Sequence, residues 1–192
     1  MSFENLDNEE LLRLSLEAIN GNRGAEAVSM LKLILSREPE HFYATYLLAA
    51  QHAQLQMFDR AEEGFRAAVA INPDFPISRF QLGQLLTMKG AADEVQHVLS
   101  PLFDNRDALG AYARGMAALA REDIDVGVRE LDAGLAMPQE IPALEADMRR
   151  LRDNLLAAAA AAEVPSATAV AEPAAAPVYF AGYGYGNAGN DE

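Results

Sequence analysis

The chain has 192 residues, no cysteine, 51% hydrophobic residues and a formal net charge of −14. The absence of cysteine excludes disulfides, thiolate metal sites and cysteine nucleophiles. An acidic surface repels nucleic-acid phosphates and anionic lipid, and no uninterrupted apolar run approaches the ~18 residues of a membrane span. We therefore expect a soluble protein with no nucleic-acid partner and no membrane insertion, and the acidic, polar N-terminal residues, which are unlike a signal peptide, predict a cytoplasmic location.

The first predicted element is an amphipathic helix that begins near residue 8. Asn8 can cap this helix, acidic residues follow in the first turn, and leucines then recur around a broad face. A polar turn around Gly21 separates it from a second helix over residues 24–36. Pro39 ends the second helix because proline lacks the donor of the next helical hydrogen bond.

The segment from Phe42 to Phe75 repeats this helix, turn and helix in its clearest form. In its second helix, Ala61, Phe65 and Ala68 alternate small and large side chains at spacings of four and three. Such alternation is typical of helices that approach closely, because large residues pack against small ones. Pro73 stops this pair as Pro39 stops the first.

Two further copies follow, each with a departure from the pattern. In the third, Pro101 comes early, so the second helix is expected to be short or kinked. The fourth begins two residues before strict spacing would place it. Its second helix carries Gly127 and Gly134, each ~1 kcal/mol less favourable than alanine in a helix. Close packing at small positions explains both glycines.

The C-terminal part has a different composition. Pro142 can start a further amphipathic helix over residues 142–162, whose polar outer face suits the open end of a helical stack. From residue 163 the composition, rich in Ala and Pro and then in Tyr and Gly, predicts a disordered tail over 163–192. Its end is apolar and spaced by glycines, and we expect it to be an interaction segment made of Val178, Tyr179, Phe180, Tyr183 and Tyr185.

The four copies resemble tetratricopeptide repeats, whose unit is about 34 residues of helix, turn and helix. The eighth position of each copy is small and the twenty-fourth is large, as that family requires. Counted from first positions Asn8, Phe42, Pro76 and Ala108, the small residues are Ser15, Ala49, Gly83 and Gly115, and the large ones are Leu31, Phe65, Leu99 and Leu131.

The resemblance implies an all-α fold, a right-handed α-solenoid of four helix pairs with a C-terminal capping helix. It implies one helical repeat domain over residues 1–162. The repeats are expected at 8–41, 42–75, 76–107 and 108–141, with the capping helix at 142–162.

No catalytic, cofactor-binding or metal-binding constellation is predicted. His41, His52 and His97 belong to three different copies, and no two of them have the helical spacing of a metal site, which favours surface or packing roles. The glycines near the C-terminus follow no strand and precede no helix, so no phosphate-binding loop is indicated. The sequence thus predicts a non-enzymatic protein without cofactor.

Recognition is then expected on the first helix of each copy, which forms the inner surface in tetratricopeptide proteins. The second, fifth, ninth and twelfth residues of these helices are apolar and aromatic here, whereas relatives that hold the acidic C-terminus of a heat-shock chaperone use Lys, Arg and Asn. An alternative is that several of these side chains are core, because first-helix residues also pack on the neighbouring helix. The predicted peptide-binding groove comprises Leu12, Leu16, Tyr43, Tyr46, Ala50, Phe80, Gln84, Thr87, Tyr112 and Met116.

Three functions remain open on this basis. The first is a scaffold or adaptor that binds an apolar or aromatic peptide segment of a protein partner. The second is a dedicated chaperone for a secreted or assembly-prone client, since the chain looks like the chaperones of type III secretion translocators, although those have about three copies and no Tyr/Gly tail. The third is self-assembly, in which the tail occupies a groove of its own chain or of a neighbour.

Overall fold

The computed structural model describes residues 3–163, and all regular structure in this range is helical. This confirms the predicted all-α fold of helix pairs. Within that range no helix is both long and apolar enough to cross a membrane. The predicted tail segment, Val178 to Tyr185, lies outside the described residues.

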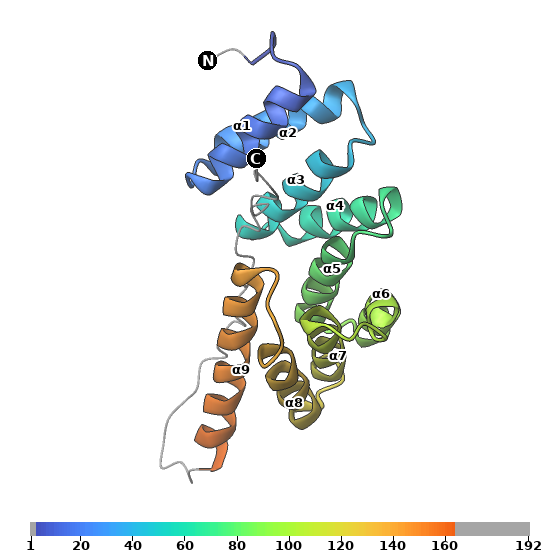
Figure 1. Ribbon diagram of the computed structural model, residues 1–192, viewed down its shortest axis with the longest axis vertical. Helices are drawn as coiled ribbons and strands as arrows, with labels where there is room; N and C mark the ends of the chain where they lie inside the picture. The colour runs from blue at the N-terminus through green and yellow to red at the C-terminus, as the bar shows by residue number, and fades with distance from the viewer. Residues whose placement is uncertain (1–2, 164–192) are drawn as a thin grey trace, which may run out of the picture. The chain divides into compact units, whose positions relative to one another are not determined.

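The helices are α1 (Asn8–Asn20), α2 (Gly24–Arg37), α3 (Phe42–Gln54), α4 (Phe58–Ile71), α5 (Pro76–Met88), α6 (Ala92–Leu99), α7 (Ala108–Leu119), α8 (Ile124–Leu135) and α9 (Pro142–Glu163), with a short 3-10 helix η1 (Ser100–Leu102) (Figure 1).

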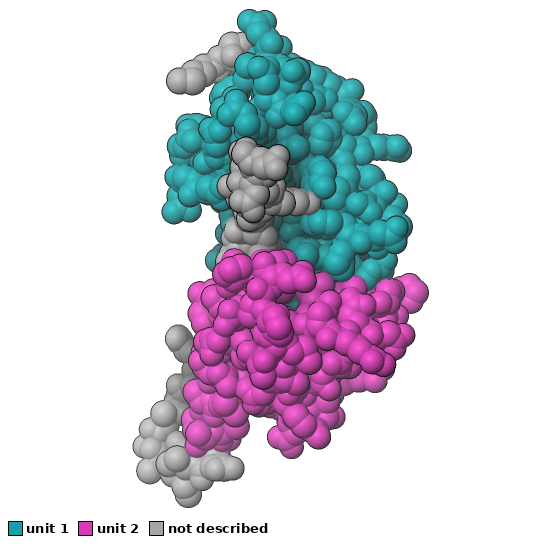
Figure 2. All heavy atoms as spheres, viewed as in Figure 1, with its two compact units in different colours: residues 1–82, 180–192 teal, residues 83–179 magenta. Residues whose placement is uncertain are grey.

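The described chain divides into two compact units, and the division falls inside α5, after Leu82 (Figure 2). In the first unit, α1 packs on α2, α2 on α3 and α3 on α4. In the second, α6 packs on α7, α7 on α8 and α8 on α9. Turns of only three or four residues join the two helices of each pair. Helices α1 and α2, α3 and α4, and α7 and α8 pack directly on each other across these turns.

The small and large residues of the repeat meet inside the helix pairs. The residues at the twenty-fourth position (Leu31, Phe65, Leu99 and Leu131) are fully buried, and so are those at the eighth. At Gly83 a Cβ atom would lie only 2.5 Å from Cδ2 of Leu99, so the leucine occupies the space that a side chain would need. The alternation of small and large residues in the sequence therefore reflects how the first helix of a pair packs against the second.

The third pair has the shortened second helix that Pro101 predicted. Helix α6 has 8 residues, whereas α2 and α4 have 14 each. Pro101 lies at the start of the 3-10 helix that follows. The expected shortening is confirmed, since proline cannot donate the hydrogen bond that would continue the helix.

The N-terminal cap of α1 is one residue earlier than predicted. Asp7, and not Asn8, caps the helix: its Oδ1 accepts from the Glu10 backbone N–H at 2.8 Å, and the Glu10 side chain accepts from the Asp7 N–H at 2.9 Å. This reciprocal capping box needs an acceptor three residues before the glutamate, a position that Asp7 holds and Asn8 does not.

The turn inside each pair has one conformation throughout. The fifteenth residue of each copy lies in this turn and has a left-handed backbone conformation, with φ between 56° and 71°. These residues are Asn22, Gln56, Gly90 and Glu122. The backbone N–H of the residue after it donates to the carbonyl five residues earlier in the chain. Examples are Arg23 to Ala18 at 2.7 Å and Asp123 to Ala118 at 3.0 Å. These are Schellman motifs, which satisfy carbonyls at a helix end. In the last copy this motif comes two residues before the position that the 34-residue spacing would give, as the early start of that copy predicts.

Replacement of Glu122 by glycine is expected to raise the free energy of unfolding by about 0.5–1 kcal/mol. A non-glycine residue costs energy in the left-handed region, and removing that strain outweighs the extra freedom of glycine in the unfolded chain. Denaturant unfolding of Glu122→Gly and Glu122→Ala would test this, because both remove the charge but only glycine removes the strain. Equal stability of the two variants would contradict it.

Candidate functional site

The structure separates the ten predicted groove residues by burial. Thr87 and both leucines are half-buried, and Tyr43 is 39% exposed. The other six are buried, with at most 8% of their surface exposed, which favours the alternative that they are core. Their part in a groove stays a prediction. These six are Tyr46, Ala50, Phe80, Gln84, Tyr112 and Met116.

Tyr46 is buried because it belongs to an aromatic cluster of the second helix pair. Its ring centroid lies 6.2 Å from that of Phe65 on α4 and 5.3 Å from that of Phe75, just beyond α4. Phe42 stacks on Tyr46 at 6.3 Å and also meets Phe75 edge-on at 5.1 Å. The tyrosine therefore packs its own helix pair together.

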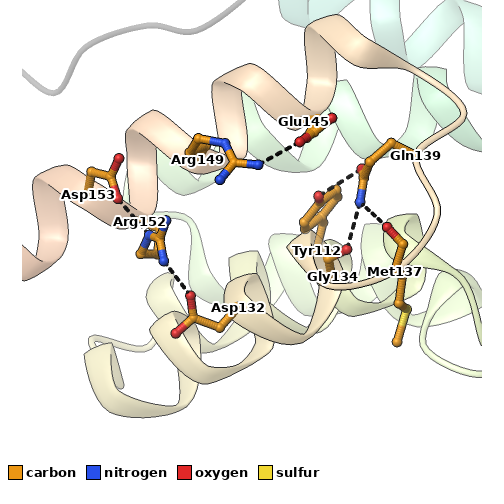
Figure 3. Close-up of polar contacts among 9 residues, drawn as sticks. All are labelled: Tyr112, Asp132, Gly134, Met137, Gln139, Glu145, Arg149, Arg152 and Asp153. Atoms are coloured by element: carbon orange, nitrogen blue, oxygen red, sulfur yellow. Dashed lines mark hydrogen bonds and ion pairs between the residues drawn. The ribbon is translucent and has the colours of Figure 1, made fainter.

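Tyr112 is buried in the second unit, where it joins α7 to the loop between α8 and α9 (Figure 3). Its hydroxyl donates to Gln139 Oε1 at 3.0 Å, and Gln139 Nε2 donates to the carbonyls of Gly134 (2.8 Å) and Met137 (2.7 Å). Burial raises the pKa of Tyr112. The ring occupies the space beside Gly134 that a side chain there would fill.

Helix α9 is held on α8 by apolar contacts and a charge pair (Figure 3). Leu144 and Met148 are buried, and Arg152 donates to Asp132 of α8 at 2.7 Å. On the outer face, Arg149 pairs with Glu145 one turn away at 2.6 Å. The predicted capping helix thus buries Leu144 and Met148 together with Asp147, and Arg149 is exposed.

The accessible groove residues of the first unit lie together. Leu12 and Leu16 of α1 and Tyr43 of α3 line a pocket of about 260 Å³, which Leu47 completes. Leu47 is absent from the predicted set, although its spacing of four from Tyr43 places both on one face of α3. We call these four residues the apolar pocket.

A second pocket, of about 510 Å³, lies in the same unit between α2, α3 and α4. Its lining includes Lys32, His52 and Arg60, together with Glu63, and we call it the basic pocket. His52 is buried, which lowers its pKa, and the positive charges of Lys32 and Arg60 lower it further, while a hydrogen bond with the Arg60 backbone opposes them. The sequence does not indicate this grouping, because its members come from three helices of two copies.

No residues of the described range form a metal site: no three His, Asp or Glu side chains there are grouped to hold an ion. His52 is buried in the lining of the basic pocket.

Comparison with known proteins finds similarity in structure. No protein-family model and no curated protein sequence matches the chain. TTC0263 of Thermus thermophilus, a thermophilic TPR protein, superposes with a TM-score of 0.60 at 16% identity, over 79% of this chain and 82% of that one. MamA of Desulfovibrio magneticus RS-1, as the fragment from residue 41, gives 0.55 at 20% identity, and the MamA RS-1 double mutant gives 0.58 at 20%; each match covers 80% of this chain and 90% of that one. Identities this low show a shared fold alone.

Proposed function

We propose that this tetratricopeptide-like protein is a non-enzymatic interaction module that binds an apolar or aromatic peptide segment of a protein partner. The observation that supports this most is the apolar pocket, where two half-buried leucines and an exposed tyrosine from neighbouring first helices surround one recess. On the basis of the sequence, we also propose that the protein is cytoplasmic and has neither a cofactor nor a nucleic-acid partner.

The size and chemistry of the apolar pocket suit one large side chain of a peptide. Its volume of about 260 Å³ is below the roughly 300–1,000 Å³ of small-molecule sites. Leu12 and Leu16 are half-buried, and their remaining exposed hydrocarbon gains free energy when a ligand removes it from water, whereas Leu47 is already buried. Tyr43 adds an aromatic wall with a hydroxyl that can reach a peptide backbone, a combination enriched at interface hot spots.

The test is selection of short peptides from a random display library on the immobilised full chain, followed by measurement of their dissociation constants. We expect selected peptides to share a large apolar or aromatic anchor. The double variant Leu16→Ala/Tyr43→Ala should weaken their binding at least tenfold, because truncating central anchors removes most interface energy. Tyr46 is unsuitable for this test, since truncation of a buried ring would destabilise the fold.

Leu55→Ala is the matched control, because Leu55 is 58% exposed and lies outside the apolar pocket. Its peptide affinities should equal those of the unchanged chain, and circular dichroism should show equal helicity for all variants. If the Leu16→Ala/Tyr43→Ala variant binds the selected peptides as well as the control does, the proposal is wrong.

The other two hypotheses predict different results in the same assay. For self-assembly, a synthetic peptide of residues 178–185 should bind the full chain and lose affinity in the Leu16→Ala/Tyr43→Ala variant. For a chaperone, the apolar pocket should instead keep one aggregation-prone client soluble, measured by light scattering.

A further inference from the structure

The basic pocket holds positive charges that the acidic protein leaves without counter-ions. Most arginines of the described chain have an acidic partner, as Arg13 has Glu17 at 2.9 Å. Lys32 and Arg60 have no ion pair within 4 Å among the described residues, and the buried His52 lies in the same lining. Exposed cations are hydrated and need no acidic partner, so the informative observation is that two of them are grouped around one recess in a chain of net charge −14.

The repeat itself supplies a comparison within the molecule. The equivalent furrow of the second unit, a pocket of about 350 Å³, contains Ala118 and Val126 at the positions of His52 and Arg60. Its half-buried arginine, Arg114, is already satisfied, since it donates to Glu130 at 2.8 Å and to the Phe103 carbonyl at 2.8 Å. The same lining also holds the exposed Arg121, so the furrow of the second unit carries one open cation and no histidine. The basic pocket differs because it groups two exposed cations, Lys32 and Arg60, with a buried histidine.

The basic pocket is separate from the apolar pocket. Tyr43 and His52 are nine residues apart on α3, which is about two and a half helical turns, so they lie on opposite sides of the helix. The two pockets share no lining residue. A ligand in one leaves the other accessible.

We propose that the basic pocket binds a compact oxyanion, a carboxylate or phosphate group of a small ligand or peptide. Lys32 and Arg60, both exposed, supply the positive charge and the N–H donors. His52 lies beside them in the lining, where its ring already makes a hydrogen bond with the Arg60 backbone, and it reports on the charge that a ligand brings. The hydroxyl of Thr45 already donates to the His41 carbonyl at 3.1 Å and is not needed. Glu63 is the carboxylate of the same lining, and its charge opposes an anion.

The experiment is a titration of the full chain at low ionic strength with two probes, inorganic phosphate and the peptide Glu-Glu-Glu, followed by imidazole NMR signals. The signals of His52 should move saturably with at least one probe. An anion beside the imidazole favours its charged form, so the pKa of His52 should rise at saturation. His41 and His97 lie outside the basic pocket and are internal references. A response to phosphate alone, or to the peptide alone, identifies which oxyanion source the basic pocket accepts.

Charge-matched variants make the test specific. Lys32→Gln/Arg60→Gln should lose at least tenfold in affinity, whereas Arg106→Gln/Arg129→Gln, which removes two exposed arginines elsewhere, should change it less than twofold. Glu63→Gln should bind about fivefold more tightly, since it removes one opposing charge near the ligand. A gain of affinity cannot come from misfolding.

The proposal is overturned if neither probe moves the His52 signals saturably, or if both double variants lose affinity equally. Equal loss would show attraction by overall charge and no site. Because the apolar pocket is on the other side of α3, these results do not depend on the peptide selection described above.

Discussion

Replacement of Phe65 by alanine is expected to lower the free energy of unfolding by about 3–5 kcal/mol, the range for deletion of a fully buried aromatic ring. Phe65 has no exposed surface and holds the twenty-fourth position of the second copy. It packs against Tyr46 with a centroid distance of 6.2 Å. The backbone of two paired helices cannot collapse fully into the space, so the loss combines transfer energy with a cavity.

Denaturant unfolding followed by circular dichroism measures this change. Leu55→Ala is the control, because it removes apolar atoms from the same unit at a side chain that is 58% exposed, and it should cost less than about 0.5 kcal/mol. A loss below about 1 kcal/mol for Phe65→Ala, or equal losses for the two variants, would show that Phe65 is not a core residue of the helix pair.

Replacement of Gly134 by leucine is expected to destabilise the protein by about 1–3 kcal/mol or more, although leucine is the better helix former by nearly 1 kcal/mol. A side chain at Gly134 would enter the space held by the Tyr112 ring. To make room the ring must move, and its hydroxyl then loses the 3.0 Å hydrogen bond to Gln139. Overpacking and the lost hydrogen bond together exceed the gain in helix propensity.

Ala133→Leu is the matched control, since it places the same side chain on the neighbouring, exposed position of α8. It should leave the melting midpoint nearly unchanged. The double variant Gly134→Leu/Tyr112→Ala should be less destabilised than the sum of its single variants, because the ring that causes the overlap is gone. Additive losses would exclude Tyr112 as the cause.

The helical repeat could be predicted from the sequence because its causes are local. The first positions Asn8, Phe42, Pro76 and Ala108 are the first residues of α1, α3, α5 and α7. The alternation of Ala61 and Phe65 reports which residues meet inside a pair, and Pro101 reports where α6 must end. Each of these signals depends on residues within about one repeat of one another, so it can be recognised in the sequence alone.

The site could be predicted only in part, because exposure depends on what packs over a residue. Tyr43 and Tyr46 lie on one helix, and both rings contact Phe75. Tyr46 also packs against Phe65 and is 2% exposed, whereas Tyr43 is 39% exposed. Leu12, Leu16 and Tyr43 were predicted as a group and do line one pocket. Their contact with a partner remains a prediction.

The sequence by itself determined the helices, their pairing and their register, since periodicity, small and large spacing and proline stops all operate between near neighbours along the chain. Only the tertiary structure decided which first-helix residues are core. It also decided that Gln56 and Glu122 are left-handed, a conformation imposed by the shared Schellman turn against the preference of their side chains. The basic pocket likewise exists only after folding, because packing of α2, α3 and α4 brings Lys32, His52 and Arg60 to one recess from positions 28 residues apart.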